Sequence, residues 1–299
     1  MYLVGLRKLL ATSLSALIPH KKLRHRVRYA LHPLNDKRCL SYFRREYVSR
    51  ELPLIENHVL RQDLVGKEII WQCWLQGLEQ APPLIKFALN SVNQYKQANQ
   101  EIRLITEENI GEYIKFPEHI IRKRAEGKIP PAQYSDLIRI YLLATYGGTW
   151  IDATCLLTAP IPQKIMDLDF FIYHSSGEFS YTLVQNCFIR AKTNSDLARI
   201  WQALMTEYWR REDSLLHYFI MHLLFKALIN ENPQVAERFE EVPYDTDNKM
   251  HALFYHVRAN GTLNSADIQE AAKLSFIHKL SYKLTIKSSD NISVLQESK

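Results

Sequence analysis

The sequence has few of the residues that mark non-globular chains. Only 9 glycines and 12 prolines occur among 299 residues, and no segment repeats at a fixed period. This excludes collagen-like, low-complexity and repeat architectures. Hydrophobic residues make up 46% of the chain and charged residues 23%, which excludes disorder for most of it and suffices for one large core or two small ones.

Cysteine is scarce and scattered. Cys39, Cys73, Cys155 and Cys187 form no C-x-x-C pair and no Cys/His cluster at the spacing of zinc ligands. A chain of this size does not need disulfides to stabilise its core, and Cys73 and Cys155 lie inside apolar runs. The pattern predicts reduced, buried cysteines in a cytosolic protein.

The N-terminal segment lacks an apolar run long enough to span a bilayer. Its apolar stretch, 9–18, is about half the length of a transmembrane helix of roughly 20 residues. Basic residues follow directly where a secretory signal would offer a cleavage site. We expect a short amphipathic helix lying on the inner face of the cell membrane, with its basic flank attracted to anionic lipids. The alternative is a solvated basic helix packed on the body.

Positive charge is concentrated in this segment. Residues 1–50 hold twelve Lys and Arg against two acidic residues, whereas the other 249 residues hold 26 basic and 30 acidic ones. The acidic body carries no sequence motif of the kind that reads a nucleic-acid groove, so we expect no nucleic-acid partner. The chain divides into a basic N-terminal segment (1–60), a globular body (61–287) and a polar tail (288–299).

The body alternates expected strands and helices. Strands are predicted at 68–74, 101–106, 149–157, 170–176 and 184–191. Helices are predicted after Pro82 and Pro83, from Glu107, at 117–127, between Pro131 and Gly147, at 195–209 and at 214–229, with a helical or mixed stretch at 247–258. The first strand, helix and strand form a βαβ unit and hence a parallel pair. The order predicts an α/β fold whose twisted mixed sheet has six or more strands and is flanked by helices.

Candidate functional residues concentrate in 135–154, SDLIRIYLLATYGGTWIDAT. Asp136 and Arg139 stand at i and i+3 on an otherwise apolar helix, so they share one face. Burying charge is costly unless the charge is paired or serves a ligand. An internal salt bridge and a ligand-gripping pair are both open interpretations.

The end of this block adds two further candidate features. Gly147 and Gly148 permit either a helix C-cap or a close approach of backbone to a ligand. Asp152 ends an apolar strand, and Thr154 is expected on the same face because side chains alternate along a strand. Alone, Asp152 would more often be a turn or cap residue, but ligands bind at the carboxyl ends of strands in open α/β sheets.

At this point the chain resembles a known family, the glycosyltransferases of the capsular polysaccharide synthesis and DxD sugar-binding type, similar to glycosyltransferase family 32. The resemblance rests on KEIIWQCWLQG (67–77), YSDLIRIYLLATYGGTWIDAT (134–154) and FIHKLSYK (276–283), in that order. It implies a GT-A fold, in which a Rossmann-like half binds a nucleotide-sugar and the rest forms the acceptor side.

The resemblance also implies roles for particular residues. Trp71 looks like the aromatic residue that stacks on the nucleotide base. Asp136 and Arg139 look like the pair that grips the donor sugar. Asp152 matches the first acid of the DxD motif, near the ribose and the metal-bound diphosphate. Asn186 is a candidate contact to a donor or acceptor hydroxyl.

One departure from the family concerns the metal. The second acid of DxD is usually a direct ligand, and here it is Thr154, which weakens a contact that a hard cation prefers. A Mn²⁺ or Mg²⁺ ion held by Asp152 is therefore an open expectation. His278, Lys279 and Lys283 resemble the C-terminal motif that closes over the diphosphate, where lysine would stabilise charge on the leaving group. A solvated basic tail is the alternative for these three.

The acceptor side is less defined. Glu207, Asp213 and His217 could face the acceptor, but the sequence does not choose among them. His217 and His222 more often serve helix packing or surface.

The implied function is transfer of a hexosyl group from a nucleotide-sugar, favouring a UDP-sugar, to a lipid-linked oligosaccharide in bacterial capsular, exopolysaccharide or O-antigen synthesis. The family implies retention of the anomeric configuration, and front-face displacement is the favoured route because no carboxylate nucleophile can be assigned. Two alternatives remain. One is a non-catalytic nucleotide-sugar-binding protein. The other is a hydrolase of activated sugars or glycans, which normally has two working carboxylates.

Overall fold

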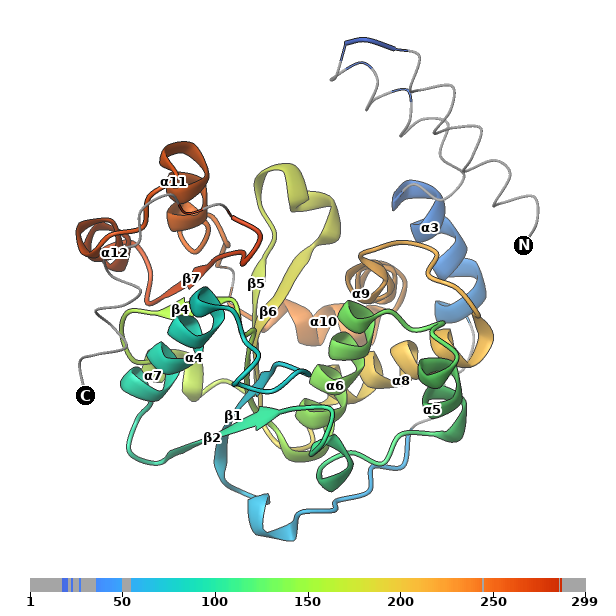
Figure 1. The fold of residues 1–299 in the computed structure, drawn as a ribbon. Coiled ribbons are helices and arrows are strands. Elements are labelled where there is room, and N and C mark those ends of the chain that lie inside the picture. Colours follow the sequence, from blue (N-terminus) through green and yellow to red (C-terminus); the bar gives the residue numbers. More distant parts are fainter. Residues whose placement is uncertain are drawn as a thin grey trace.

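The computed structural model describes residues 18–20, 23, 27, 36–49, 55–243, 245–284 and 286. Within them, a five-stranded mixed sheet lies between two layers of helices (Figure 1). In sheet order, the strands are β2 (Gln100–Ile105), β1 (Glu68–Cys73), β3 (Gly148–Ile151), β6 (Val184–Ala191) and β5 (Phe170–His174). The predicted α/β class with a mixed sheet is confirmed.

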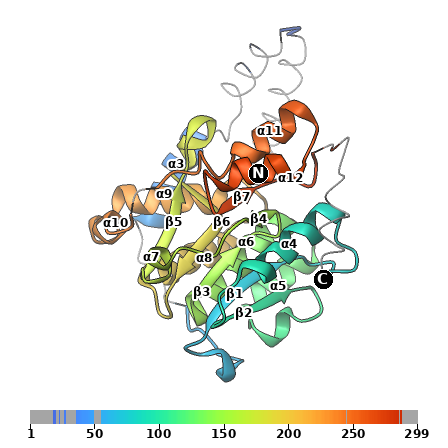
Figure 2. The ribbon, with the colours of Figure 1, turned by 90° about the vertical axis from the view of Figure 1, so that its left-hand side faces the viewer.

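The sheet combines a parallel and an antiparallel half, and Figure 2 shows its strands side by side. β1 runs parallel to both β2 and β3, whereas β6 runs antiparallel to β3 and β5. Helix α4 (Pro83–Tyr95) connects β1 to β2 and begins with proline at its first turn. The predicted βαβ unit is confirmed, and the carboxyl ends of β1, β2 and β3 lie on one edge of the sheet.

Both faces of the sheet are covered, so the strands are apolar on both sides. In β1, Ile69 and Trp71 point into the larger core, beneath α6 (Pro131–Tyr146), α8 (Asp196–Arg211) and α9 (Ile220–Glu231). Ile70 points into a second core, beneath α4 and α7 (Gln163–Met166). Because side chains within β1 alternate between the two cores, a side chain of this segment can leave the sheet only beyond the end of β1.

The strand predicted at 149–157 is divided in two. β3 ends at Ile151, and the chain turns so that Cys155 N donates to the carbonyl oxygen of Asp152 at 2.8 Å. β4 (Cys155–Leu157) then pairs antiparallel with β7 (Ile277–Lys279) in a separate two-stranded sheet. The apolar run is continuous because β3 and β4 are both buried, so hydropathy does not reveal the turn. The prediction of six or more strands in one sheet is therefore wrong.

Several helix boundaries also differ from the sequence prediction. The helix expected from 214 begins at Ile220, because the preceding loop is held by Tyr208, whose hydroxyl donates to Ser214 O and accepts from Leu216 N. The helix expected from Glu107 is a 3-10 turn, Ile110–Glu112. The other predicted helices correspond to α5 (Glu118–Ala125), α6, α8 and α11 (Ala252–Asn260).

Two short helices were not predicted, although their caps are visible in the sequence. α10 (Pro233–Glu240) has proline at its first turn, and the Asn232 side chain accepts from Val235 N. α12 (Ser265–Ala272) has a capping box between Asn264 and Asp267. Each helix is only eight residues long, so its apolar periodicity is weak.

Part of the N-terminal segment packs on the body. α3 (Asp36–Phe43) and a π-helical turn (Arg44–Val48) lie against α8 and α9, and Cys39, Phe43 and Tyr47 are fully buried there. The predicted membrane helix and its basic flank lie outside the described residues except at 18–20, 23 and 27, and so does the polar tail. Among the described helices, none combines the length and apolarity needed to cross a membrane.

All four cysteines are free and buried, which confirms the prediction that they are unpaired core residues. The thiol of Cys155 donates to the carbonyl oxygen of Cys187 at 3.8 Å, so these two side chains pack together in the second core. They behave as small apolar residues.

Candidate functional site

The carboxyl ends of β1 and β3 open into a pocket of about 320 Å³, here called the Asp152 pocket. In α/β sheets this edge is where ligands bind. Its walls come from the residues after β1, the start of α6, the turn after β3, β6, the loop before α9, and β7. Its main polar and aromatic lining residues are Trp74, Gln133, Asp136, Arg139, Trp150, Asp152, Thr154, Asn186, Tyr218, Phe219, His222 and Lys279.

Arg139 joins the charged groups of the pocket. Its Nη2 donates to Asp152 Oδ1 at 3.0 Å and lies 3.4 Å from Asp136 Oδ1, one helical turn earlier. Its Nη1 donates to the carbonyl oxygen of Asn186, and its guanidinium lies 4.8 Å from the ring centre of Trp150. The side chain is 5% exposed. One buried cation therefore links two carboxylates, which a simple i,i+3 salt bridge would not require.

Asp152 follows the last residue of β3, and both of its oxygens are engaged. Trp150 Nε1 donates to Oδ1 at 2.7 Å, in addition to Arg139. Lys279 Nζ donates to Oδ2 and to Thr154 Oγ1, each at 2.6 Å. Burial favours the neutral acid, but Lys279 and Arg139 outweigh it and lower the pKa of Asp152. Asp152 is held as a carboxylate.

Thr154 reaches Asp152 by a different route from the one predicted. The sequence placed both on one face of a continuous strand, but Thr154 lies in the turn between β3 and β4. The ammonium of Lys279 bridges the two side chains, so they share a partner although they do not share a strand.

The pKa of Asp136 shifts in the opposite direction from that of Asp152. Burial raises its pKa from 3.8 to about 6, although Arg139 counteracts this. Asn186 Nδ2 donates to Asp136 Oδ1 at 3.0 Å from the neighbouring strand β6. Asp136, Arg139 and Asn186 thus present carboxylate, guanidinium and amide groups together, a set suited to binding hydroxyl groups.

The structure contradicts the predicted role of Trp71. Its side chain is fully buried in the larger core, packs on Tyr113 and Tyr146, and donates through Nε1 to Gly147 O at 2.8 Å. Trp71 lies within β1 rather than at its end, so the ring has no face open to a ligand. It is a core residue.

Gly147 and Gly148 serve backbone packing rather than ligand binding. Gly147 is the C-cap of α6 with φ 71°, and a Cβ there would lie 2.4 Å from Thr193 N. A Cβ on Gly148, with φ 99°, would lie 2.4 Å from Ile69 O. The helix C-cap interpretation is the correct one, and the predicted contact with the donor is wrong.

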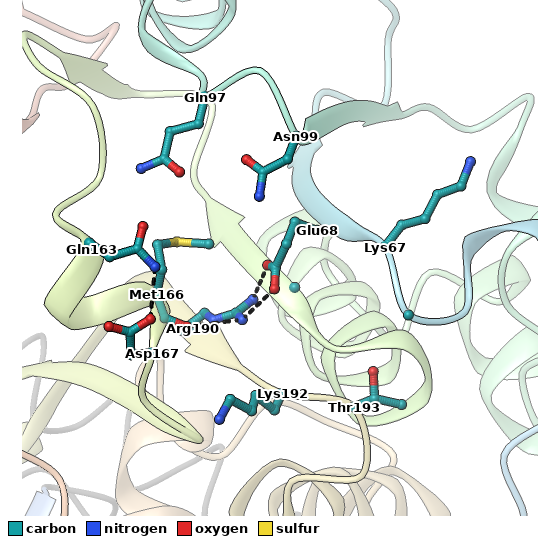
Figure 3. A pocket seen from close by; sticks show the side chains of 12 residues that line it. Lys67, Glu68, Gln97, Asn99, Gln163, Met166, Asp167, Arg190, Lys192 and Thr193 are labelled. Atoms are coloured by element: carbon teal, nitrogen blue, oxygen red, sulfur yellow. Dashed lines mark hydrogen bonds and ion pairs between the residues drawn. The ribbon is translucent and has the colours of Figure 1, made fainter.

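The glycines also lie at the wrong end of β3. Gly148 begins the strand that Asp152 follows, and it lines a different pocket, at the amino ends of β1 and β3 (Figure 3). In that pocket Arg190 donates to both oxygens of Glu68 at 2.7 and 2.9 Å. The two charges pair with one another there.

Of the three C-terminal candidates, His278, Lys279 and Lys283, only Lys279 lines the Asp152 pocket. Lys279 enters the Asp152 pocket, whereas His278 is fully buried and its Nε2 lies 3.1 Å from Thr158 Oγ1. Burial lowers the pKa of His278 to about 4, so it is neutral, and its predicted contact with the donor is wrong. Lys283 is exposed, with its ammonium 5.9 Å from the ring centre of Tyr282. Its role stays a prediction.

The three acceptor candidates do not line the pocket. Glu207 pairs with Arg210 on α8, and Asp213 pairs with Lys123 at 3.1 Å. His217 precedes the lining residues Tyr218 and Phe219, and its Nδ1 accepts from Phe219 N. The structure therefore brings none of the three to the carboxylates.

The sequence analysis singled out only part of the pocket lining: it missed Trp74, for example, and assigned His222 to packing or surface. Trp74, directly after β1, packs edge-on against Tyr282 with ring centres 5.7 Å apart, and its Nε1 is buried without a partner. His222 faces the pocket from α9, where burial and Arg139 lower its pKa to about 3. The end of an apolar strand was a usable signal for Trp74, whereas a histidine on an apolar helix gave none for His222.

The residues around Asp152 do not fit a divalent cation. Asp152 has both oxygens bonded, Thr154 supplies only a neutral hydroxyl, and Arg139 already bridges the second carboxylate, Asp136. Among the described residues, no three His, Cys, Asp or Glu side chains form a group that could hold a metal. A hard cation prefers several oxygen ligands with charge, so the predicted metal contact of Asp152 finds no supporting ligand set.

The raised pKa of Asp136 predicts that its charge destabilises the fold. The cost is present above about pH 6 and disappears as the pH falls toward 3.8, so at pH 7.5 it is on the order of 2–3 kcal/mol. Asp136→Asn should therefore raise the free energy of unfolding at pH 7.5, and this gain should shrink toward pH 4. Urea unfolding at both pH values measures it.

The matched control for this prediction is Asp213→Asn. Lys123 lowers the pKa of Asp213, so removing its charge should give no gain at pH 7.5. An Asp136→Asn protein no more stable than wild type at pH 7.5 would contradict the prediction.

Two fungal O-glycosyltransferases are similar in sequence to part of this chain. The O-glycosyltransferase PaGT of Phomopsis amygdali is 25% identical over 180 residues, 54% of this chain and 43% of that protein. The O-glycosyltransferase braB of Annulohypoxylon truncatum is 22% identical over 169 residues, 50% of this chain and 39% of that protein. The matched segment spans less than half the length of either relative.

Solved structures of glycosyltransferases share a more distant likeness. The structure titled PaToxG Glycosyltransferase has a TM-score of 0.43 and 12% identity, covering 91% of this chain and all of that one. The apo-form glycosyltransferase GlyE of Streptococcus pneumoniae TIGR4 has a TM-score of 0.42 and 8% identity, covering 77% and 59%.

A family model covers nearly the entire chain. It is described as "Capsular polysaccharide synthesis protein" and matches residues 28–298, which include every lining residue of the Asp152 pocket. The chain belongs to the capsular polysaccharide synthesis protein family.

Proposed function

We propose that the protein is a glycosyltransferase that binds a nucleotide-sugar in the Asp152 pocket and transfers its sugar to a lipid-linked glycan in surface polysaccharide synthesis. The observation that carries this proposal is the convergence of Asp136, Arg139, Asp152 and Lys279 at the carboxyl edge of the sheet. Family membership and the likeness to O-glycosyltransferases support it. The mixed sheet between helices is the architecture that a GT-A enzyme needs.

The donor sugar binds at the Asp136 end of the pocket. The Asp136 carboxylate accepts hydrogen bonds from sugar hydroxyls, while Arg139 and Asn186 donate to them. These three side chains come from a buried helix and a central strand, so their positions are fixed before the sugar arrives. Such positioning is a main source of catalysis in group transfer.

The diphosphate binds at the other end, beside Lys279 and Arg139. An ammonium has three donors, and Asp152 and Thr154 use two of those of Lys279, which leaves one for a phosphate oxygen. Fixed cations stabilise the charge that develops on the leaving nucleoside diphosphate. The base then lies over Trp74, which follows β1, and Tyr282, which follows β7, and these rings take the place of the buried Trp71.

Front-face displacement with retention is the route that this arrangement favours. Both pocket carboxylates lie within 3.4 Å of Arg139, so neither is a free nucleophile. The leaving phosphate accepts the proton of the acceptor hydroxyl. A glycosylated protein trapped during turnover and seen by intact-mass spectrometry would contradict this route.

A hydrolase is the second candidate, because one observation favours it. Asp136 and Asp152 have pKa values shifted in opposite directions, as in enzymes that pair a carboxylic acid with a carboxylate. A hydrolase would release free sugar without an acceptor. A non-catalytic protein would bind nucleotide without any turnover.

Turnover of purified full-length protein with a panel of UDP- and GDP-sugars tests the proposed activity. With membrane lipid extract, one donor should release nucleoside diphosphate, and Asp152→Asn should lower this rate about 100-fold through loss of a preorganised charge. Asp169→Asn, an acid 86% exposed outside the pocket, is the control and should leave the rate unchanged.

Two outcomes of this assay would contradict transfer. Sugar release that does not depend on extract would identify a hydrolase. No turnover with any donor, despite measurable nucleotide binding, would identify a non-catalytic protein.

The proposed stacking role predicts that Trp74→Ala weakens binding of the nucleoside diphosphate. A base–aromatic stack contributes about 1–3 kcal/mol, which corresponds to a rise in Kd of about 5- to 150-fold. Trp74→Phe keeps a ring and should restore much of the affinity. Calorimetric titration measures both, and an unchanged Kd in Trp74→Ala would remove Trp74 from the donor site.

We also propose that the basic N-terminal segment holds the protein on the inner face of the cell membrane, where lipid-linked acceptors lie. Its support is the excess of twelve Lys and Arg over two acids in residues 1–50. The full chain should sediment with vesicles that contain anionic lipid, and deletion of residues 1–30 should reduce this more than transfer to a soluble acceptor analogue. Equal loss of both would indicate a folding role.

A further inference from the structure

Lys279 is fixed in the pocket by its backbone. It ends β7, where it stands opposite Cys155 of β4, and its N–H donates to Met250 O at 2.9 Å. The next residue, Leu280, donates to Thr154 O at 2.9 Å. The strand that carries the lysine is therefore bonded to the turn that carries Asp152 and Thr154.

The ammonium occupies the space between the two side chains of that turn. Its distances to Asp152 Oδ2 and Thr154 Oγ1 are both 2.6 Å, so both contacts are short charge-assisted hydrogen bonds. The side chain is 26% exposed, so one side of the ammonium faces the pocket. Burial opposes its charge, but Asp152 outweighs burial and raises the pKa of Lys279. A permanent cation thus stands between Asp152 and Thr154, the first and third residues of the sequence Asp-Ala-Thr.

The other charges of the pocket leave no second place for a cation. Arg139 lies between Asp136 and Asp152, at 3.4 and 3.0 Å from their Oδ1 atoms. A divalent ion at either carboxylate would stand close to at least one of these two cations, in a partly buried site where like charges repel strongly. His278 faces Thr158 instead, and His222, which lines the pocket, belongs to no group of three His, Cys, Asp or Glu side chains that could hold a metal among the described residues.

We propose that Lys279 is the resident cation of the donor site and that the protein binds the diphosphate of its donor without a divalent metal ion. The inference rests on the proposed function, because it assigns the charge that meets the diphosphate of that same site. Asp152 and Thr154 then act as positioning residues that hold the ammonium toward the pocket.

Lys279 stays protonated through the transfer. As the bond between the anomeric carbon and the diphosphate oxygen breaks, the electron pair goes to that oxygen, and the third N–H of Lys279 stabilises its charge. The acceptor oxygen forms the new bond to the anomeric carbon and gives its proton to the leaving phosphate. Lys279 neither gains nor loses a proton, so it can replace a metal ion but not a base.

The first test uses wild-type protein. Calorimetric titration with UDP and with GDP, in EDTA and then in excess Mn²⁺, should give Kd values that agree within about twofold. Electron paramagnetic resonance of Mn²⁺ added to nucleotide-free protein should show only free ion. Binding that requires Mn²⁺, or bound Mn²⁺ that Asp152→Asn abolishes, would overturn the proposal.

The second test removes the ammonium of Lys279 or replaces it by a guanidinium. Lys279→Ala should weaken UDP or GDP binding in EDTA by about tenfold or more, while binding of the corresponding nucleoside stays unchanged, because a nucleoside has no phosphate. Lys279→Arg keeps the charge and should retain much of the affinity, and Lys273→Ala, at a lysine 67% exposed outside the pocket, is the matched control. Equal loss for nucleoside and nucleotide in Lys279→Ala would show a structural role and contradict the proposal.

The third test separates this inference from the proposed function. The double variant Lys279→Ala with Thr154→Asp replaces the ammonium by a second carboxylate, and it should bind Mn²⁺ in the resonance titration without any nucleotide. Wild-type protein that binds neither Mn²⁺ nor any nucleotide, with a double variant that binds Mn²⁺, would refute the donor site while supporting Lys279 as the resident cation. Failure of the folded double variant to bind Mn²⁺ would contradict the placement of that cation.

Discussion

The Asp152 pocket depends on a balance of four partly buried charges. Arg139 and Lys279 stand against Asp136 and Asp152, and every charge has a partner of opposite sign within 3.4 Å. Burying any one of them alone would cost several kcal/mol, so each is buried beside a partner, although for Asp136 the partner does not fully offset the cost of burial. The network joins α6, β3 and β7, which are separated by up to 143 residues between Asp136 and Lys279. Packing of distant segments is thus a condition for the site, and the site in turn fixes how those segments meet.

The turn after β3 makes this meeting feasible. Had 149–157 continued as one strand, Thr154 would have stayed in the main sheet and β4 would not pair with β7. Because β3 ends at Ile151, the chain leaves the sheet at Asp152, and the small β4–β7 sheet brings Lys279 back to the same edge. A local break in the sheet therefore places the second cation of the pocket.

Features set by residues close in sequence could be predicted from the sequence. Features set by where strands end and how they pair could not. Asp136 and Arg139 share a face because helical spacing fixes it, and a long apolar helix bounded by Pro131 and Gly147 is a strong signal. Trp71 and Trp74 are three residues apart in one apolar run, and only the end of β1 tells which ring leaves the sheet. His278 and Lys279 are adjacent, so they point to opposite sides, and the pairing of β7 with β4 decides which one enters the pocket.

The glycines illustrate the same limit. A Gly-Gly pair after a helix predicts freedom of the backbone, but not what approaches it. At Gly148 the close neighbour is the carbonyl oxygen of Ile69 in the adjacent strand, not a ligand. Distances between strands are a tertiary property, and hydropathy carries no information about them.

The pKa values of the two carboxylates shift in opposite directions, which supports the proposed donor site. A salt bridge that served stability would lower the pKa of each acid it contains, as Lys279 and Arg139 do for Asp152. Burial instead raises the pKa of Asp136 to about 6, and Arg139 keeps a buried Nε without a partner. The fold thus tolerates an incompletely satisfied pair at the point where the pocket opens. In the proposed donor site, Asp136 and Arg139 are the groups whose hydrogen bonding a ligand would complete.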